Sequence, residues 1–446
     1  MKFHVISFGC QMNANDSDWL VRALESRGWT ETPEEQASVF IVNTCSVREK
    51  PEQKVYSLLG RLEQYARRDG GVFAAVGGCV AQQVGRGFFE RFSFVRLVFG
   101  TDAVALAPEA LERLAQSPDE RLALLDFLPT YAEREDPAPK AGGPAQAFVN
   151  IMQGCDNFCT YCIVPYVRGR QKSRQPGAVL AECRGLAARG VREITLLGQN
   201  VNSFGLDRGG AGVSFAQLLR QVAAIPGVER LRFTTSHPKD IADEVIAAFG
   251  ELENLCPALH LPLQSGSDAI LKRMGRRYDT ARYLDIVERL QRARPGISLS
   301  TDLIVGFPGE TDADFEATLR MVERVGFESS FSFKYSDRPG VAAVRMEPKI
   351  DEETAAARLE HLQNLQNTLT KDCLEKCVGT QTVVLIEGPS RKQDAGAPSL
   401  RGRDPAGRTV NVTLDGGADL TGKMVPVRLV EAKKHSLVGE KAGASW

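Results

Sequence analysis

Short apolar runs alternate with amphipathic segments along most of this chain of 446 residues, and this alternation limits the folds that it can adopt. Within residues 1–127 the runs are HVISF, SVFIVNT, GVFAAVGG and VRLVFG, and segments such as DSDWLVRALESRG between them have helical periodicity. Strands that alternate with helices build βαβ units whose strands lie parallel. We therefore predict an N-terminal parallel-sheet α/β domain over residues 1–127. Its first helix is predicted to have Asp16 as N-cap, Arg27 in the last turn and Gly28 in the C′ position just after its end.

The alternation is interrupted by AEREDPAPKAGGPAQ, a segment rich in Pro, Gly and charge, and it starts again near residue 147. We predict a linker over 128–146 and a second domain over 147–377. The second domain contains the apolar runs AFVNIM, REITLLG, RLRFTT, ALHLPL, SLSTDLIVGF and SSFSFKY. Six βα repeats predict a partial (β/α)6 barrel, in which chemistry lies on the loops at the carboxyl ends of the strands. The domain is predicted to end in one long helix over 351–377.

The last part of the chain, residues 378–446, has the runs TVVLIEG, TVNVTL and VPVRLVEA, separated by Gly-rich turns. This pattern predicts a small all-β barrel or sandwich. Ten Lys and Arg stand against seven Asp and Glu from residue 379 onward, and this part has no Phe or Tyr. Stacking of bases on aromatic rings of those two kinds is therefore not available within it.

Overall composition excludes several classes of protein. The net charge is -1, so any contact with nucleic acid must come from local basic patches. The N-terminal segment MKFHVISFGCQMNANDSD has no long apolar core, and no 18 apolar residues stand together, so we expect neither a signal peptide nor a membrane span. We expect the protein in the cytoplasm, where clustered cysteines more often hold metal or do redox work than form disulfides.

Three cysteines in the segment CDNFCTYC are spaced C-xxx-C-xx-C, at Cys155, Cys159 and Cys162. The run FVNIMQG leads directly into them, which places them at the catalytic end of the predicted barrel. Structural zinc sites want four ligands, and no Cys or His follows closely. Three thiolates on a 4Fe-4S cluster would leave one iron open for a small chelating ligand. The alternatives are a zinc loop completed by a distant residue, and three buried apolar cysteines.

A second trio of cysteines lies in the N-terminal domain, where Cys10, Cys45 and Cys79 each follow a predicted strand. The carboxyl ends of parallel strands lie at one edge of a sheet, so these three thiols are predicted to converge there. They could hold a cluster, or they could be ordinary buried cysteines at strand ends.

The C-xxx-C-xx-C loop after the first barrel strand resembles the signature of the radical S-adenosylmethionine enzymes, with Tyr161 as the usual aromatic residue before the last cysteine. The resemblance implies that the open iron binds S-adenosylmethionine and that an electron from the cluster cleaves it to a 5′-deoxyadenosyl radical. Gln199 and Asn200 stand where many members have Gly-Gly-Glu. The predicted cofactor contacts, most of which follow strands, are Tyr161, Gln199, Asn200, Ser236, Gln264 and Gly306, although a plain βα turn also explains Gly306.

Over essentially its full length the chain resembles the methylthiotransferases, through FGCQMNANDSD, VNTCSVRE, GGC, QGCDNFCTYCIVPYVRGR, LLGQNVNSFG, TTSHP, HLPLQSGS and DLIVGFPGET. The motifs QMN, NTCSVRE, VPYVRGR and TLLGQNVNSFG are similar to those of the MiaB type. That type adds a methylthio group to carbon 2 of N(6)-dimethylallyl-adenosine beside the anticodon of tRNA.

The same resemblance implies two 4Fe-4S clusters, a radical-generating one on Cys155, Cys159 and Cys162 and an auxiliary one on the N-terminal trio, Cys10, Cys45 and Cys79. It implies two S-adenosylmethionine molecules per turnover and an external electron donor, and we expect a monomer. Two alternatives stay open. One is a methylthiotransferase for threonylcarbamoyl-adenosine tRNA or a ribosomal protein. The other is a non-catalytic iron-sulfur RNA-binding sensor.

Binding of RNA is predicted at two places. The run VRGRQKSR follows the cysteine loop and contains Arg168, Arg170, Lys172 and Arg174, which could bind phosphates or the cofactor carboxylate, or form a solvated basic loop. The C-terminal part resembles the TRAM domain and is expected to grip phosphate and sugar of the tRNA anticodon stem-loop, with the base read at the mouth of the barrel. His237 and His260, near strand ends, are expected to be structural.

Overall fold

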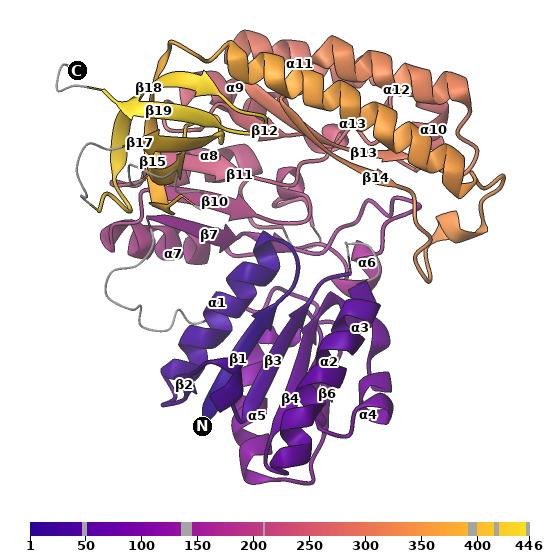
Figure 1. The fold of residues 1–446 in the computed structure, drawn as a ribbon, viewed down its shortest axis with the longest axis vertical. Helices are drawn as coiled ribbons and strands as arrows, with labels where there is room; N and C mark the ends of the chain where they lie inside the picture. Colours follow the sequence, from indigo (N-terminus) through magenta and orange to yellow (C-terminus); the bar gives the residue numbers. More distant parts are fainter. Residues whose placement is uncertain (47–50, 135–144, 208–209, 391–398, 414–418, 443–446) are drawn as a thin grey trace.

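The computed structural model describes residues 1–46, 51–134, 145–207, 210–390, 399–413 and 419–442, arranged as three bodies (Figure 1). An N-terminal α/β body lies below a central body of strands and helices, and a small β-barrel lies beside the central body (Figure 1). Within these described ranges there is no helix with both the length and the apolarity that crossing a membrane requires.

The N-terminal body is built on one parallel sheet, as predicted, with the strand order β2-β1-β3-β4-β5-β6. Strands β3 and β4 are buried on both faces, because helices cover the sheet on either side. The strands are β1 Lys2–Ser7, β2 Thr30–Glu31, β3 Val39–Thr44, β4 Phe73–Gly78, β5 Val95–Phe99 and β6 Leu122–Leu124. The helices are α1 Gln11–Glu25, α2 Pro51–Arg68, α3 Cys79–Val84, α4 Gly87–Arg91 and α5 Ala107–Gln116.

The predicted start of the first helix is wrong. Helix α1 begins at Gln11, with Cys10 in the N-cap position, so Asp16 lies inside the helix. Asp16 is buried, and its carboxylate Oδ1 accepts a hydrogen bond from Arg134 at 2.7 Å, so it caps nothing. An Asp just before an amphipathic segment is typical of a helix start. Here the carboxylate instead pairs with Arg134, more than a hundred residues away, and this partner is visible only in the structure.

Six parallel strands form the central body, and they coincide with the six predicted apolar runs. They are β7 Gln146–Asn150, β10 Glu193–Leu197, β11 Arg230–Phe233, β12 Ala258–His260, β13 Ser298–Val305 and β14 Ser329–Lys334. The first three make one sheet and the last three another, with a bridge between Leu231 and Leu255. Strands β7 and β14 are the edges, so the barrel is open, as a partial barrel should be.

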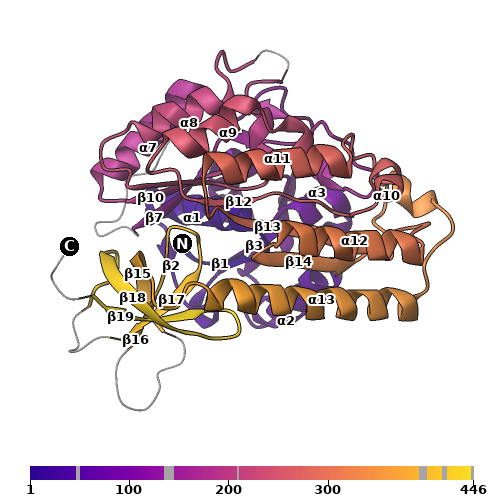
Figure 2. The same ribbon diagram turned by 90° about the horizontal axis from the view of Figure 1, so that it is seen from above.

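Helices cover the outer side of these strands, and all of them except α10, whose Ile270 packs with Phe307, share one hydrophobic core with the strands. They are α7 Pro176–Ala188, α8 Phe215–Ala223, α9 Asp243–Glu251, α10 Asp268–Arg273, α11 Thr280–Ala293, α12 Asp312–Val325 and α13 Glu352–Glu375. Helices α12 and α13 lie side by side along β13 and β14 (Figure 2). The predicted long helix over 351–377 is α13, and its N-cap is Asp351, whose side chain accepts from the backbone N–H of Thr354.

The C-terminal body is a closed barrel with the strand order β15-β16-β17-β19-β18. The prediction of a barrel or sandwich is thereby resolved in favour of a barrel, although the strands β16 and β19 were not predicted. The five strands are β15 Gln381–Pro389, β16 Ser399–Arg403, β17 Thr409–Thr413, β18 Met424–Ala432 and β19 Leu437–Lys441. Closure leaves no open sheet edge, and the inward-facing Val and Leu side chains fill the small interior.

This small barrel sits at the amino ends of the central strands. Arg230 begins β11 and donates hydrogen bonds to the carbonyls of Val383 and Arg403, while Arg408 pairs with Glu328, just before β14. The Arg230 guanidinium also forms a buried ion pair with Glu193, the first residue of β10. The C-terminal barrel therefore does not cover the carboxyl ends of the central strands, and the N-terminal body contacts them instead.

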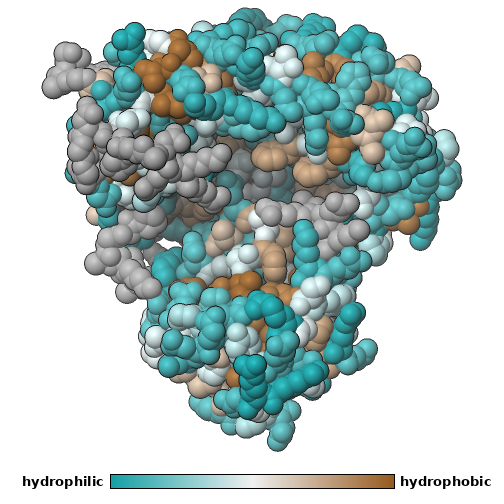
Figure 3. All heavy atoms as spheres, viewed as in Figure 1, coloured by the Kyte–Doolittle hydropathy of each residue, from teal (hydrophilic) through white to brown (hydrophobic). Residues whose placement is uncertain are grey.

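The carboxyl edges of the two parallel sheets meet each other. The short strands β8, Met152–Gln153, and β9, Lys172–Ser173, contact the segment that follows β5: Gln153 donates to Asp102, and Lys172 forms a buried ion pair with Asp102. Helix α1 packs on β7, and α3 packs on the short helix α6, Val164–Val167. The molecule is hollowed between these two bodies, and apolar as well as polar side chains line the hollow (Figure 3).

Only part of the predicted linker lies within the described residues, since 135–144 fall outside them. Gln146, its predicted last residue, already belongs to β7, and the described residues 128–134 do not run free through solvent. Leu128 donates its backbone N–H to Asp102 at 2.7 Å, Arg134 pairs with Asp16, and Glu133 pairs with Arg174 of the central body. This segment therefore helps to fix the two bodies to each other.

We predict that Arg230→Met lowers the free energy of unfolding by about 3 kcal/mol, because it removes a donor from the carbonyls of Val383 and Arg403 and removes one of the ion-pair partners of Glu193. Thermal unfolding of the full chain measures the loss. The matched control is Arg192→Met, since Arg192 forms an exposed pair with Glu229 and should contribute less than about 1 kcal/mol. Equal losses in both variants would contradict the role assigned to Arg230.

Candidate active site

The cysteines of the C-xxx-C-xx-C loop lie together between β8, Met152–Gln153, and helix α6. Cys159 is buried, and Cys155 and Cys162 are half-buried. Burial, with a smaller contribution from the neighbouring thiols, raises the pKa of Cys155 to about 11 and that of Cys162 to about 12. Without a cation, these thiols therefore stay protonated at neutral pH, and a bound cluster would supply the positive charge that their thiolates need.

A buried guanidinium stands against this loop. Arg276 Nη1 lies 3.5 Å from Cys159 Sγ, and the same side chain donates to the carbonyl of Pro262 and to the hydroxyl of Tyr278, each at 3.1 Å. These bonds hold the guanidinium in one orientation, where it partly offsets the negative charge of three metal-bound thiolates. Nothing in the sequence around Arg276 signals this role, since the contact joins residues 117 positions apart.

The N-terminal cysteines occupy the carboxyl edge of the N-terminal sheet, as predicted. Cys10 is the N-cap of α1, Cys45 follows β3 directly, and Cys79 begins α3 after β4. A hydrogen bond from the Cys45 thiol is the main cause that lowers the pKa of Cys10, to about 5, and the charge of Arg168 adds to it against the effect of burial. At Gly9, with φ +123°, an added Cβ would lie 2.4 Å from Cys45 Cβ, so glycine allows this close approach.

Arg168 joins the two cysteine sites. It follows α6 in sequence, is 3% exposed, and its Nη2 donates to Asn13 Oδ1 at 3.2 Å. Burial by itself would lower the pKa of Arg168, but the thiols of Cys79 and Cys10 outweigh it and raise the pKa. Cys79 also packs against Ile163 and Val167 of α6. The auxiliary trio therefore lies against the segment that immediately follows Cys162.

Gln199 makes a second link between the bodies. Its Oε1 accepts a hydrogen bond from the backbone N–H of Gly154 at 2.7 Å, and its Nε2 contacts the Met12 sulfur. The side chain of Gln199 is thus used to hold the start of the cysteine loop against α1. This leaves its predicted contact with the cofactor without support from the geometry.

Neither cysteine trio has the arrangement of a single-ion site. Across the described ranges, no three His, Cys, Asp or Glu side chains converge closely enough to hold one metal ion. A cluster makes a different demand, because each cysteine of a cluster binds a separate iron and the thiols must stand apart around an inorganic core. Three thiols on one loop, with a guanidinium beside them, fit a cluster and do not fit a structural zinc ion.

Buried polar atoms without a partner gather at the carboxyl ends of β10 and β11. Among the described residues none forms a hydrogen bond with Asn200 Oδ1, Ser236 Oγ, His237 Nε2 or either side-chain amide atom of Asn202. Each such group costs about 1–3 kcal/mol when it stays unsatisfied. A polar ligand that binds here would supply the missing bonds, which fits the amino-acid part of S-adenosylmethionine.

Two of these residues were not among the cofactor contacts predicted from the sequence. Asn202 was not predicted, and His237 was expected to be structural. The Nδ1 of His237 accepts from the backbone N–H of Lys239 at 3.2 Å, and burial lowers the pKa of the imidazole to about 2. The ring is therefore neutral, its proton is on Nε2, and that N–H is the donor that lacks a partner.

The remaining predicted cofactor residues serve the protein itself in this structure. The backbone N–H of Gln264 donates to the backbone carbonyl of Asp302 of β13 at 2.8 Å. The N–H of Gly306 donates to Glu310 at 2.7 Å, as in a plain βα turn. The Tyr161 ring packs edge-on against Phe307, with the centroids 6.3 Å apart. Of these three residues, Tyr161 belongs to the cysteine loop itself.

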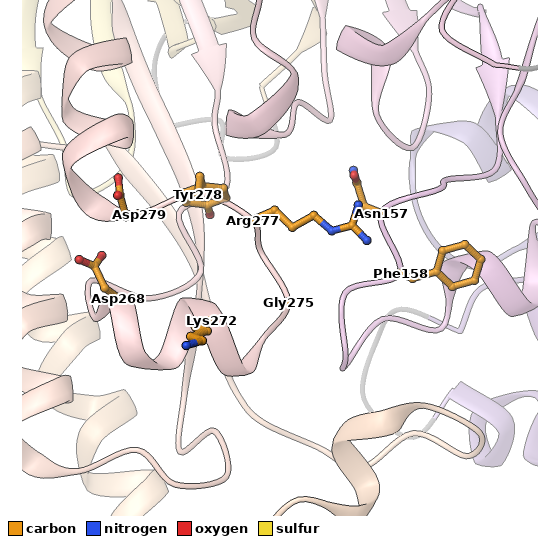
Figure 4. Close-up of a pocket in the computed structure, with 8 residues that line it drawn as sticks. All are labelled: Asn157, Phe158, Asp268, Lys272, Gly275, Arg277, Tyr278 and Asp279. Carbon is orange, nitrogen blue, oxygen red and sulfur yellow. The ribbon is translucent and has the colours of Figure 1, made fainter.

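A pocket of about 430 Å³ flanks the cysteine loop, and Asn157 and Phe158 of the loop line it (Figure 4). Figure 4 shows Arg277 reaching across it toward Asn157, which belongs to the loop. Asn157 Nδ2 lies 3.5 Å from Asp240 Oδ2, and Asn200 Nδ2 donates to that same oxygen at 2.7 Å. The pocket therefore adjoins the polar strand ends through Asn157. Its lining consists of Asn157, Phe158, Asp268, Lys272, Gly275, Arg277, Tyr278 and Asp279.

The predicted RNA-binding run has to be corrected. Arg168, Lys172 and Arg174 are buried, and each is committed to partners within the protein: Lys172 to Asp102, and Arg174 to Glu133 and Glu182. From these positions they do not reach an RNA phosphate. The run is basic because it crosses the interface between the two bodies, where its charges meet carboxylates and thiols.

Arg170 is the exposed exception in that run. It pairs with Asp156 and its guanidinium lies over the Phe158 ring, 5.2 Å from the centroid. Phe158 and Tyr166 are both exposed and pack edge to face, with their centroids 6.3 Å apart. This surface, Phe158, Tyr166 and Arg170, lies directly outside the cysteine loop and offers aromatic faces and one positive charge.

Comparison with known proteins agrees with this division of the chain. Residues 149–322 match the family model described as the Radical SAM superfamily, and residues 2–100 match the one described as uncharacterized protein family UPF0004. The chain is 61% identical to the tRNA-2-methylthio-N(6)-dimethylallyladenosine synthase of Nitratidesulfovibrio vulgaris, over 100% of this chain and 99% of that one. A synthase of the same name from Oleidesulfovibrio alaskensis is 58% identical, over 99% of both chains.

Among solved structures, the chain is similar to the radical S-adenosylmethionine methyltransferase TsrM from Kitasatospora setae, determined with cobalamin and a 4Fe-4S cluster bound. The TM-score is 0.56 and the identity 15%, over 89% of this chain and 77% of that chain. At this identity the likeness concerns the fold alone, and it covers both the N-terminal α/β body and the open barrel.

We predict that in metal-free protein at pH 7, iodoacetamide labels Cys10 before Cys155 and Cys162. A thiol is deprotonated and reactive above its pKa, so Cys10, with a pKa of about 5, is a thiolate at pH 7, whereas the other two, at about 11 and 12, remain thiols. Mass spectrometry of peptides measures the order. Arg168→Gln should move the labelling of Cys10 to higher pH. Buried Cys183 is the unlabelled control, and early labelling of Cys155 would contradict the assignment.

Proposed function

The chain belongs to the family of the tRNA-2-methylthio-N(6)-dimethylallyladenosine synthases, and we propose that it performs their reaction with two 4Fe-4S clusters held at facing sheet edges. It is a radical SAM enzyme, a tRNA methylthiotransferase that adds a methylthio group to carbon 2 of N(6)-dimethylallyl-adenosine. Full-length similarity to relatives of this one name favours that base over a threonylcarbamoyl-adenosine or a ribosomal protein.

One observation carries the two-cluster proposal: the N-terminal trio lies against the segment that follows Cys162. Cys79 packs on α6, and Arg168 reaches from the barrel side to Cys10 and Cys79. A reaction that forms a radical and then inserts sulfur into the same base needs its two sites to face one substrate. A sensor that only binds RNA would have no need of the unpartnered polar atoms beside the cysteine loop.

In this proposal Cys155, Cys159 and Cys162 hold the cluster that binds S-adenosylmethionine, and Cys10, Cys45 and Cys79 hold the auxiliary cluster. When bound, the first supplies the electron for reductive cleavage of S-adenosylmethionine and the second carries the sulfur. Two S-adenosylmethionine molecules serve each turnover, one as the methyl donor and one as the source of the radical, and an external protein or small molecule donates the electrons.

The side chains around the loop have separate tasks. Asn200, Asn202, Ser236 and His237 give their unused polar atoms to the amino and carboxylate groups of S-adenosylmethionine. Arg276 offsets the charge of the thiolates and fixes the position of Cys159. Because all five are buried, water is largely excluded from the place where the radical forms.

Contacts with the tRNA anticodon stem-loop divide between two surfaces. Beside the cysteine loop, Phe158, Tyr166 and Arg170 can stack on an unpaired base and hold its phosphate. The C-terminal barrel carries the exposed charges Arg428 and Lys434 and serves to grip the RNA backbone. We propose that the enzyme acts as a monomer in the cytoplasm, since the described site is assembled from one chain.

We predict about eight irons per chain in anaerobically reconstituted protein and about four in the variant with Cys10, Cys45 and Cys79 all changed to Ala. Iron and sulfide analysis with Mössbauer spectroscopy measures both. The matched control changes Cys183 and Cys256, two buried cysteines outside both trios, to Ala and should keep about eight irons. About four irons in the wild type would remove the auxiliary cluster and leave a one-cluster enzyme.

We predict that the double variant Arg428→Ser, Lys434→Ser weakens tRNA binding and lowers its salt dependence. For two lost phosphate contacts, the slope of log K against log salt should fall by about 1.5. Reductive cleavage of S-adenosylmethionine without RNA should stay unchanged. The control pair is Arg282→Ser with Arg292→Ser, exposed charges on α11, which should leave binding as it is. Parallel loss of cleavage would contradict a separate RNA-binding role.

A further inference from the structure

Two phenylalanines on strand β14 are exposed in a way that the rest of the barrel does not explain. Phe331 is 61% exposed and Phe333 is 52% exposed. They lie in a strand whose residues alternate between exposed and half-buried. Large apolar side chains that stand together in water are typical of a surface that binds a ligand or partner. We call this pair the β14 apolar surface.

The register of the sheet shows which way this surface faces. Phe331 is in register with Asp302, and Phe333 with Ile304 of β13, and residues in register in a parallel pair point to the same side. Leu303, between those two residues of β13, points to the opposite side and belongs to the core beneath α12 and α13. The phenylalanines therefore point away from the helices, toward the inner face of the open barrel.

Contacts on that inner face agree with this direction. The Phe331 ring packs edge-on against His260 of β12, with the centroids 6.0 Å apart. His260 in turn is held by Ser300, at 2.9 Å from Nδ1, and by Asp302, at 3.3 Å from Nε2. A polar wall whose groups satisfy one another thus borders the two phenylalanines and fixes the position of the first ring.

The β14 apolar surface leads toward the cysteine loop. Phe333 stands beside Ile304, which packs on the apolar cluster of Phe307 with Tyr161, the residue before Cys162. Strand β14 is an edge strand of the open barrel, and the exposure of Phe331 and Phe333 shows that its inner face is not covered at these residues. An occupant of this surface therefore lies next to the place where the radical is generated.

We propose that Phe331 and Phe333 bind the dimethylallyl substituent of the substrate base and so select the N(6)-modified adenosine over the unmodified one. This inference rests on the proposed function. The substituent is a branched apolar group of five carbons, and it gains free energy when two aromatic faces remove it from water. It also attaches at the edge of the base opposite to its sugar, so holding it positions the ring for reaction at carbon 2.

The test compares two anticodon stem-loop RNAs, one with the dimethylallyl group on the target adenosine and one without. Binding of each to the reconstituted holoenzyme is measured by titration, and methylthiolation of the modified RNA is followed by mass spectrometry. The wild type should bind the modified RNA about tenfold tighter. In the double variant Phe331→Ala, Phe333→Ala this ratio should fall to about one, with the affinity for the unmodified RNA unchanged within about twofold.

Two controls separate this role from a structural one. The variant Phe331→Leu, Phe333→Leu keeps an apolar surface and should restore about half of the discrimination on the free-energy scale, about threefold. Leu206→Ala removes another apolar side chain, 72% exposed and distant in sequence from β14, and should change neither affinity. Reductive cleavage of S-adenosylmethionine without RNA reports whether each variant still folds and carries its cluster.

The outcomes are distinct. A reduced ratio with cleavage intact supports the proposal. Equal weakening of both RNAs, or an unchanged ratio in the double alanine variant, overturns it, since the phenylalanines would then serve general RNA binding or none. If the wild type fails to methylthiolate the modified RNA under conditions where it cleaves S-adenosylmethionine, the proposed function itself fails, and the ratio of affinities then has no bearing on catalysis.

Discussion

The buried guanidinium of Arg168 is the interaction on which the arrangement of the site depends. It extends from the segment after one cysteine trio into the other, where it contacts Asn13 and stands among the sulfurs of Cys10 and Cys79. A cation taken this far out of water is tolerated only where negative or strongly polar groups surround it. Two parallel sheets, each ending in cysteines, are thereby held edge to edge, and every function proposed above requires that both edges face one substrate.

The other charges at the interface follow the same logic. Lys172 with Asp102 and Arg134 with Asp16 are buried pairs between residues that lie far apart in sequence. Breaking a buried pair by removing one partner is much more costly than losing a surface pair, so such pairs fix one relative position of the bodies even where they add little net stability. At the other end of the barrel, Arg230 does the same for the C-terminal body. The central barrel is thus fixed at both ends, and the inner face of β14 remains for the substrate.

Polar groups at the site divide into two kinds. Some, such as Gln199 and the backbone of Gly306, already have partners within the protein and serve to shape the loops. Others, such as Ser236 and the Nε2 of His237, are buried without a partner. Sequence motifs include both kinds without distinction, because a loop-shaping residue and a ligand-binding residue follow the strand in the same way. Hydrogen-bond geometry separates them, which is why the predicted cofactor contacts were only partly supported.

The sequence by itself determined the six strands of the central barrel, the parallel sheet of the N-terminal body and the position of both cysteine trios at strand ends, because hydrophobic periodicity and the geometry of βα units are local properties. It also indicated three thiolates per site, from spacing in the C-xxx-C-xx-C loop and from position at strand ends in the N-terminal domain. Only the tertiary structure decided what the charges do. The start of α1 at Cys10, the pairing of Asp16, the burial of Arg168 and the contact of Arg276 with Cys159 all depend on partners distant in the chain. Long-range electrostatic contacts leave no periodic signal in a sequence, so they appear only once the chain is folded.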